Sequence, residues 1–291
     1  MRFALLTCDP LPEPDPDQGP LVGAFRARGH EAEPVVWDDP DADFAPYDAL
    51  LIRATWDYAR KADAFAAWLD RPDVVPRLWN RPEIVRWNMH KGYLLELEAR
   101  GVPIVPTLVV GADAPTTPAT AARERGWHDV VVKPAISAGS ARTQRFTPDS
   151  LGDADAFVAS WNGASEAIVQ PYLPSVEGTT GGRPERAIVW IDGLVTHVVE
   201  KSRRFAGDEE AVRARGDATP EEVAFAVRTI EACPFDPLYA RIDVMDGPGG
   251  ETLLSELELI EPSLYFDLGP GSAATLAQAA ARRVESMESS I

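Results

Sequence analysis

The sequence predicts an α/β protein: an amino-terminal parallel α/β domain followed by two α+β subdomains. Short apolar runs alternate with helix-like segments up to about residue 83, the pattern of a parallel sheet with crossover helices. Later, apolar runs flank Asp192-Gly193 and the turn-rich segment 246–250, two hairpin signals that indicate antiparallel sheet. We therefore expect domains at residues 1–83, 84–169 and 170–291.

The first domain contains three apolar runs that end in polar residues. We expect strands at 3–7, 33–37 and 49–53, and a helix at 21–28 that ends at Gly29. Ligands of parallel sheets bind at the carboxyl ends of the strands. The candidate substrate residues are polar side chains at such an end, each of which could instead be a turn or capping residue: Arg53, Thr55, Asp57 and Tyr58.

The rest of the chain combines helices with hairpins. We expect a helix at 84–100 that carries Lys91, and a mobile polar loop at 202–220. The other expected elements are strands at 130–133, 167–170, 187–191, 194–199, 238–245 and 251–260, and helices at 221–232 and from 273 to the end.

Composition narrows the classes of partner. The net charge of −18 argues against nucleic acid and membrane surfaces, which are themselves anionic. The two cysteines, Cys8 and Cys233, make no disulfide framework, which fits a cytoplasmic protein. No leader segment and no apolar run long enough to span a bilayer is evident. We expect a small-molecule substrate.

Lysine is rare in this chain and stands in particular places. Only four of the 28 basic residues are lysines. Lys91 precedes an apolar helical run, while Lys133 and Lys201 each end an apolar strand. A lysine kept where arginine is the rule suggests that a compact ammonium group is needed, as at a phosphate oxygen.

The second hairpin concentrates carboxylates. Side chains alternate between the faces of a strand, so Arg241 shares a face with Asp243, and Glu256 shares one with Glu258. This could be a solvated face of an amphipathic hairpin. Three close carboxylates, however, repel one another unless a cation lies between them, and such oxygens suit Mg²⁺.

The first hairpin predicts a cationic face. A two-residue turn at Asp192-Gly193 pairs Arg186 with Val199, a register that places Arg186, His197 and Lys201 on one face. Such a face suits a triphosphate, although a solvated sheet edge would give the same sequence pattern. We expect His197 to be a packed residue, because no second metal ligand lies near it.

Two weaker motifs complete the set. Ser137, Gly139 and Ser140 form a small-residue loop whose backbone could approach phosphate oxygens, but the chain has neither a P-loop nor a dinucleotide fingerprint. Adenine needs a backbone edge between apolar walls, and its ribose needs a carboxylate nearby. The candidate nucleotide residues at a strand end are Gln170, Tyr172, Leu173 and Glu177.

In this order, the motifs resemble those of the ATP-grasp superfamily, in the branch of glutathione synthetase, RimK-type ligases and D-alanine–D-alanine ligase. The runs 53–58 and 255–266 resemble a sub-branch of small bacterial proteins that includes D-cycloserine synthetase. One departure is Glu258, which stands where those enzymes usually have Asn, so the metal site is more negative.

The resemblance implies an ATP-dependent carboxylate–amine ligase that works through an acyl phosphate, with ATP and two Mg²⁺ as cofactors. The most specific expectation is cyclisation of O-ureido-D-serine. The alternatives are a RimK-like ligase acting on a peptide or protein, and a non-catalytic ATP-binding protein; a dimer or tetramer stays open.

The resemblance also implies residue roles. Arg241 would hold substrate and stabilise the acyl oxygen, and Lys201 would act near the transferred phosphoryl group. The expected nucleotide ligands are Lys91, Lys133, Ser137, Gly139, Ser140, Gln170, Tyr172, Leu173, Glu177, Arg186 and Lys201. The expected metal ligands are Asp243, Glu256 and Glu258.

Overall fold

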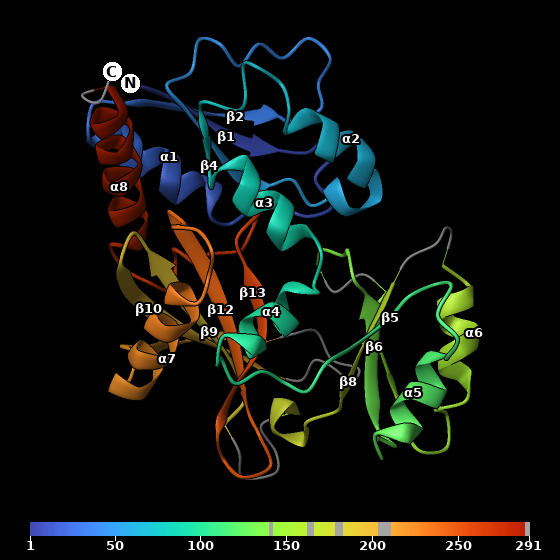
Figure 1. Ribbon diagram of the computed structural model, residues 1–291. Helices are drawn as coiled ribbons and strands as arrows, with labels where there is room; N and C mark the ends of the chain where they lie inside the picture. Colours follow the sequence, from blue (N-terminus) through green and yellow to red (C-terminus); the bar gives the residue numbers. More distant parts are fainter. Residues whose placement is uncertain (140–141, 162–165, 178–182, 203–210, 289–291) are drawn as a thin grey trace.

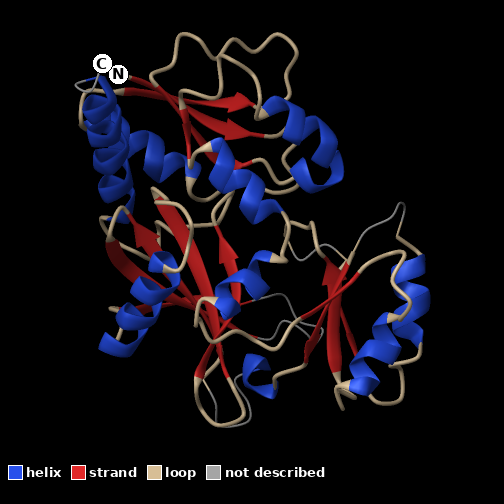
Figure 2. Ribbon diagram, in the orientation of Figure 1, coloured by secondary structure: helices blue, strands red, loops and turns tan. Residues whose placement is uncertain are grey.

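Three sheets organise the chain in the computed structural model, shown as ribbons in Figures 1 and 2. The structure describes residues 1–291 except 140–141, 162–165, 178–182, 203–210 and 289–291. One sheet is parallel, and the other two are antiparallel. This mixed α/β architecture confirms the predicted fold class.

The amino-terminal sheet has the strand order β2-β1-β3-β4 and is parallel. Its strands are β1 (Arg2–Thr7), β2 (Glu31–Val36), β3 (Ala49–Ala54) and β4 (Leu78–Trp79). The accompanying helices are α1 (Gln18–Ala27), η1 (Tyr58–Lys61) and α2 (Ala62–Trp68). The predicted strands are confirmed, while β4 and α2 were not predicted.

The carboxy-terminal helix α8 (Ser272–Glu288) lies beside α1 at the amino-terminal sheet (Figure 1). Leu276 and Ala280 of α8 are buried in one cluster with Phe25 of α1 and Phe3 of β1. The end of the chain therefore closes the core of its first domain, instead of packing only within the last subdomain.

The predicted helix at 84–100 is wrong as one element, because it is two: α3 (Pro82–Met89) and α4 (Tyr93–Ala99). His90 is extended, and the backbone N–H of Lys91 donates to the carbonyl of Ala135 at 2.8 Å. Lys91 thus lies in the break between two helices, where its side chain can turn toward the strands instead of following a helix face.

The central sheet is antiparallel with the order β5-β8-β6-β7. Its strands are β5 (Leu108–Val110), β6 (Val130–Pro134), β7 (Gln144–Phe146) and β8 (Ala167–Pro171). Helices α5 (Pro118–Glu124) and α6 (Asp153–Ala159) pack with it around a cluster whose buried members lie between residues 110 and 169. This core is separate from those of the other two sheets.

The third sheet has the order β11-β10-β9-β12-β13 and carries most of the predicted site. Its strands are β9 (Glu185–Ile191), β10 (Leu194–Ser202), β11 (Ala211–Gly216), β12 (Tyr239–Asp246) and β13 (Thr252–Glu258). Helix α7 (Pro220–Glu231) and the short helix η2 (Pro174–Glu177) accompany it. The loop predicted at 202–220 contains β11, which pairs with β10, so that prediction is wrong for 211–216.

A bulge at Thr196 changes the predicted register of the first hairpin. Leu194 pairs with Ile191 as expected, but the register then shifts and Arg186 pairs with Glu200 instead of Val199. A one-residue slip moves every later side chain to the other face. The prediction that Arg186 shares a face with Lys201 is therefore wrong.

In the part of the chain that the structure describes, no helix combines the length and the apolar character that crossing a bilayer requires.

Candidate functional site

A cavity of about 860 Å³ lies where the three sheets meet. The predicted site residues that line it come from all three regions of the chain: Tyr58, Lys91, Lys133, Ser137, Gly139, Lys201, Arg241, Glu256 and Glu258. Residues about 200 positions apart are thus brought together, as the ordered motifs predicted.

Two lysines converge on one carboxylate at the cavity wall. Lys91 Nζ lies 2.7 Å from Glu256 Oε1, and Lys133 Nζ lies 3.5 Å from Glu256 Oε2. Lys91 also donates to the carbonyl oxygen of Ser137 at 3.0 Å. All three charged side chains are largely buried, so their charges act through a medium of low polarity. An arriving phosphate would compete with Glu256 for these ammonium groups.

A second charged cluster lies deeper, on the same sheet face. Lys201 Nζ is 2.8 Å from Asp243 Oδ2 and 3.0 Å from Glu185 Oε1, while Arg241 binds Asp243 with two nitrogens at 2.9 Å each. Burial alone would raise the pKa of Asp243, but the charges of Arg241 and Lys201 outweigh it and hold the pKa below its ordinary value. Asp243 is therefore a carboxylate with both oxygens occupied.

Glu258 completes this cluster on the cavity side. It pairs with Arg241, yet burial, and then the nearby charges of Asp243 and Glu256, raise its pKa. The charge of Arg241 therefore does not offset burial and the two neighbouring acids. This is a place where a cation would be stabilised.

The donor set fits Mg²⁺ through Glu256 and Glu258. Both carboxylates line the cavity from one face of β13, and Mg²⁺ usually takes one or two carboxylates together with phosphate oxygens. Within the described residues no group of three or more His, Cys, Asp or Glu side chains forms a ready cage. Asp243 does not line the cavity, and a metal would have to displace Lys201 or Arg241 to reach it.

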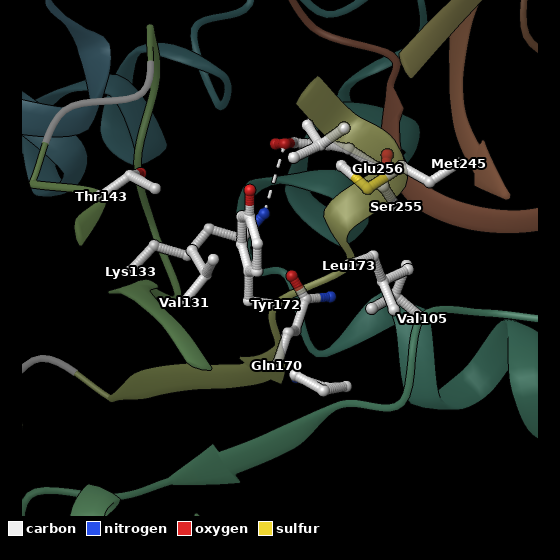
Figure 3. A pocket seen from close by; sticks show the side chains of 12 residues that line it. Val105, Val131, Lys133, Thr143, Gln170, Tyr172, Leu173, Met245, Ser255 and Glu256 are labelled. Carbon is white, nitrogen blue, oxygen red and sulfur yellow. Dashed lines mark hydrogen bonds and ion pairs between the residues drawn. The ribbon is translucent and has the colours of Figure 1, made fainter. Parts of the chain in front are cut away.

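A narrower, mainly apolar pocket adjoins the cavity and shares Lys133, Thr143 and Glu256 with it. In Figure 3 the side chains of Val131 and Tyr172 lie across from those of Met245, Leu173 and Val105, and Lys133 points toward Glu256. Gln170 lies at the end of the pocket (Figure 3), where its amide donates to Thr107 at 3.0 Å. Flat apolar walls with polar groups at the ends suit a purine ring.

Two predicted nucleotide residues lie elsewhere. Arg186 is fully buried on the opposite face of the third sheet, where it pairs with Glu222 and Asp246. Glu177 accepts a hydrogen bond from the hydroxyl of Tyr172 at 2.8 Å and lines neither pocket. Ser140 lies outside the described residues.

Of the substrate residues predicted in the amino-terminal domain, some line the cavity and others do not. Tyr58 lines the cavity, but Arg53, Thr55 and Asp57 do not. Asp57 instead accepts from the indole N–H of Trp37 at 2.8 Å and pairs with Lys61. Asp57 therefore helps to hold its own domain together.

Arg53 fixes a loop of the third region. Its guanidinium donates to the carbonyl of Pro262 at 2.6 Å and lies 3.4 Å from Asp17. The carboxylate of Asp17 accepts from the backbone N–H groups of Leu264 and Phe266, at 2.5 and 2.9 Å. This loop carries Glu261, Ser263 and Tyr265, which line the cavity.

Sequence reasoning missed Glu185, Glu261 and Tyr265. Asp243 pairs with Ala187 of β9, and Glu185 lies two residues from Ala187, so Glu185 and Asp243 share a sheet face. Strand alternation would have shown this once the register between β9 and β12 was known. Tyr265 has a φ of +50°, a strained value for a tyrosine that no sequence pattern shows. Its ring faces Arg241 at 5.7 Å.

The comparisons with known proteins agree with this geometry. A family model described as the N-terminal domain of D-cycloserine synthetase DcsG matches residues 3–80. The cycloserine biosynthesis protein DcsG of Streptomyces lavendulae is 31% identical over 304 residues, which cover 98% of this chain and all of that protein. The crystal structure of D-cycloserine synthetase DcsG is 30% identical, with a TM-score of 0.87 and the same coverage.

A more distant solved structure shows the same fold. The RimK domain ATP-grasp protein of Sphaerobacter thermophilus is 20% identical, with a TM-score of 0.69 over 97% of this chain and all of that one. At this identity the likeness extends to the fold alone.

Proposed function

The chain belongs to the family of ATP-grasp ligases that includes D-cycloserine synthetase DcsG, and from that membership we propose that it cyclises O-ureido-D-serine. As an ATP-grasp ligase it uses ATP to form a C–N bond. The observation that carries the proposal is the convergence of Lys91, Lys133, Arg241 and Glu256 around one cavity, beside a pocket shaped for a purine.

The site residues have different roles, which follow from their charge and position. Lys91 and Lys133 hold the ATP phosphates, and the pocket of Val131, Leu173 and Met245 holds the base. Bound Mg²⁺, held by Glu256 and Glu258, would neutralise charge on the phosphates. Positioning and electrostatic stabilisation account for most of the catalysis in phosphoryl transfer.

The reaction has two steps. The substrate carboxylate attacks the γ-phosphorus of ATP and gives an acyl phosphate and ADP. A ureido nitrogen then attacks the carbonyl carbon, closes the ring and releases phosphate. Arg241 stabilises the negative charge that develops on the acyl oxygen. Asp243 fixes the guanidinium of Arg241 through two hydrogen bonds, so the donor is oriented before substrate arrives.

Phosphate release from ATP with O-ureido-D-serine tests the proposal. Glu256→Gln removes the carboxylate shared by both lysines and the metal, so we expect kcat to fall by ~10²–10³. The matched control is Glu251→Gln, an exposed acid at the turn before β13, which should stay within about twofold of wild type.

Other outcomes favour the alternatives. Phosphate release that requires a peptide would indicate a RimK-like ligase. Nucleotide binding without release from any amino-acid derivative would indicate a non-catalytic protein.

A further inference from the structure

Among the acids that line the large cavity, Glu261 is half-buried and has no cationic partner within the described residues. Glu256 and Glu258 are each paired with lysine or arginine, and Glu13 is exposed to solvent. A negative charge on Glu261 would therefore be neither balanced by an ion pair nor fully screened by water. Such a carboxylate is suited to bind a cation supplied by a ligand.

The backbone that carries Glu261 is held firmly. Arg53 binds the carbonyl of Pro262, and Asp17 accepts from the N–H of Leu264. Both anchors are almost fully buried and come from the amino-terminal domain. Glu261 thus projects from a fixed loop, and a preorganised group binds its ligand at a smaller entropic cost.

Tyr58 presents a second polar group to the same space. Its side chain is 3% exposed and lines the cavity, and none of the described residues hydrogen-bonds to its hydroxyl. Glu261 lines the same cavity, and burial, and then the negative charge of Glu261, raise the pKa of Tyr58. Two hydrogen-bonding groups therefore face one region of the cavity from different domains.

The surroundings of Glu261 favour an added positive charge. Burial and the charge of Glu258 raise the pKa of Glu261 to about 8, although Lys91 and Arg241 act in the opposite direction. Arg241 also donates to the carbonyl of Ser263, two residues along the same loop, at 3.4 Å. A cation at Glu261 would therefore lie close to the guanidinium that holds the reacting carboxylate.

We propose that Glu261 binds the protonated α-amino group of the substrate, with the hydroxyl of Tyr58 as a second hydrogen-bond partner. In an α-amino acid the ammonium and the carboxylate are attached to one carbon, so a carboxylate at Arg241 places the ammonium beside the loop of Glu261. This assignment rests on the proposed function and names a specificity-determining residue for it: Glu261 selects substrates that carry a free amino group.

The test compares two ligands on the wild type and its variants. Calorimetry in the presence of Mg²⁺ and a non-hydrolysable ATP analogue measures the affinity for O-ureido-D-serine and for its deamino analogue, 3-(ureidooxy)propanoate. We expect the wild type to prefer the amine by about 10- to 100-fold, and Glu261→Gln to lose that preference. Asp267→Asn, an exposed acid on the same loop, should keep it.

Equal affinity of the wild type for both ligands, or binding of neither, would overturn the assignment, and so would an unchanged preference in Glu261→Gln. Tyr58→Phe, which keeps the ring, should lose about 3- to 10-fold in affinity for the amine alone. The failure of the proposed function would look different. It would be an amine bound with the expected preference and no phosphate released from ATP.

Discussion

Lys201 illustrates how neighbouring charges define a residue in this site. Its side chain is 4% exposed, and burial alone would lower its pKa, but the charges of Asp243 and Glu185 raise it. The ammonium group therefore stays charged at any physiological pH. Because two carboxylates already bind it, Lys201 serves chiefly to balance the negative charge of the acids around Arg241. To bind a nucleotide, its ammonium group would have to give up one of these carboxylates.

Glu261 gives a pH dependence of stability that can be measured. Burial, and then the charge of Glu258, raise its folded pKa from the ordinary 4.5 to about 8, although Lys91 and Arg241 act in the opposite direction. Between these two pH values the folded protein retains a proton that the unfolded chain has released, so this group makes stability fall as pH rises.

Glu261→Gln does not titrate. In urea unfolding at pH 5, 6.5 and 8 we therefore expect the wild type to lose more stability toward pH 8 than the variant. Parallel curves for the two proteins would contradict the raised pKa.

At the scale of elements, the bulge in β10 decides which side chains reach the site. With the extra residue Thr196, Lys201 pairs with Glu185 and shares the face of Asp243; without it, Lys201 would lie on the opposite face, with Arg186. The bulge therefore separates two cationic groups: Lys201 enters the site, and Arg186 anchors α7 on the other side.

Helix α7 depends on a carboxylate with two functions. Glu222 closes the capping box with Thr219, and it also pairs with the buried Arg186 and with Arg215. We expect Glu222→Gln to lower the free energy of unfolding by about 3 kcal/mol, because it removes one of the two carboxylates that balance the buried guanidinium of Arg186. Thr219→Ala, which removes only part of the cap, should cost about 1 kcal/mol.

Urea unfolding measures both changes, and enzyme kinetics provides the contrasting readout. Because Arg186 lies on the face away from the cavity, the KM for ATP should stay within about twofold of wild type in the Glu222 variant. A large rise in that KM with unchanged stability would instead indicate that Arg186 contributes to the nucleotide site.

At the scale of the whole molecule, the buried clusters group the chain differently from the expected boundaries. Residues of α3 and α4 pack with the third sheet, and α8 packs with the first, whereas the cluster between residues 110 and 169 stands alone. We propose that residues 108–171 form the central subdomain and that the other two regions form one support for it.

The pair of Asp17 and Arg53 joins the first domain to the loop of Glu261. We expect Asp17→Asn to cost about 3–5 kcal/mol, because it leaves the guanidinium of Arg53 buried without its carboxylate. In enzyme still folded at low temperature, the KM for O-ureido-D-serine should rise more than the KM for ATP, since the loop borders the substrate and the base pocket does not contain it.

Arg28→Gln is the control for this prediction. It changes an exposed contact between the residue that follows α1 and Gln278 of α8, and should alter stability by about 0.5 kcal/mol or less. Equal effects of the two variants, or equal changes in both KM values, would show that the Asp17 pair does not act through the loop.

Much of the fold could be predicted from the sequence, because the patterns that indicate it are formed by residues close together in the chain. The alternating elements of the first domain and the Asp192-Gly193 turn depend on residues close together in the chain, and the structure confirms them. The scarcity of lysine pointed to Lys91, Lys133 and Lys201, all of which line the cavity. Local patterns also placed Arg241 with Asp243 on one face of β12, and Glu256 with Glu258 on one face of β13.

The remaining features depended on contacts between distant residues. The break at Lys91 arises from a hydrogen bond to Ala135, and the role of Arg53 arises from a loop about 200 residues away. Neither contact produces a recognisable pattern in the sequence around the residue.

By itself, the sequence determined the class of fold, the ATP-grasp order of motifs and the residue types that the chemistry requires, since these follow from period, turn residues and composition. Only the tertiary structure decided which charges face one another, which face Arg186 occupies and that Glu261 has no cationic partner among the described residues. The physical reason is that electrostatic roles depend on distances through space, and folding sets these without regard to separation along the chain.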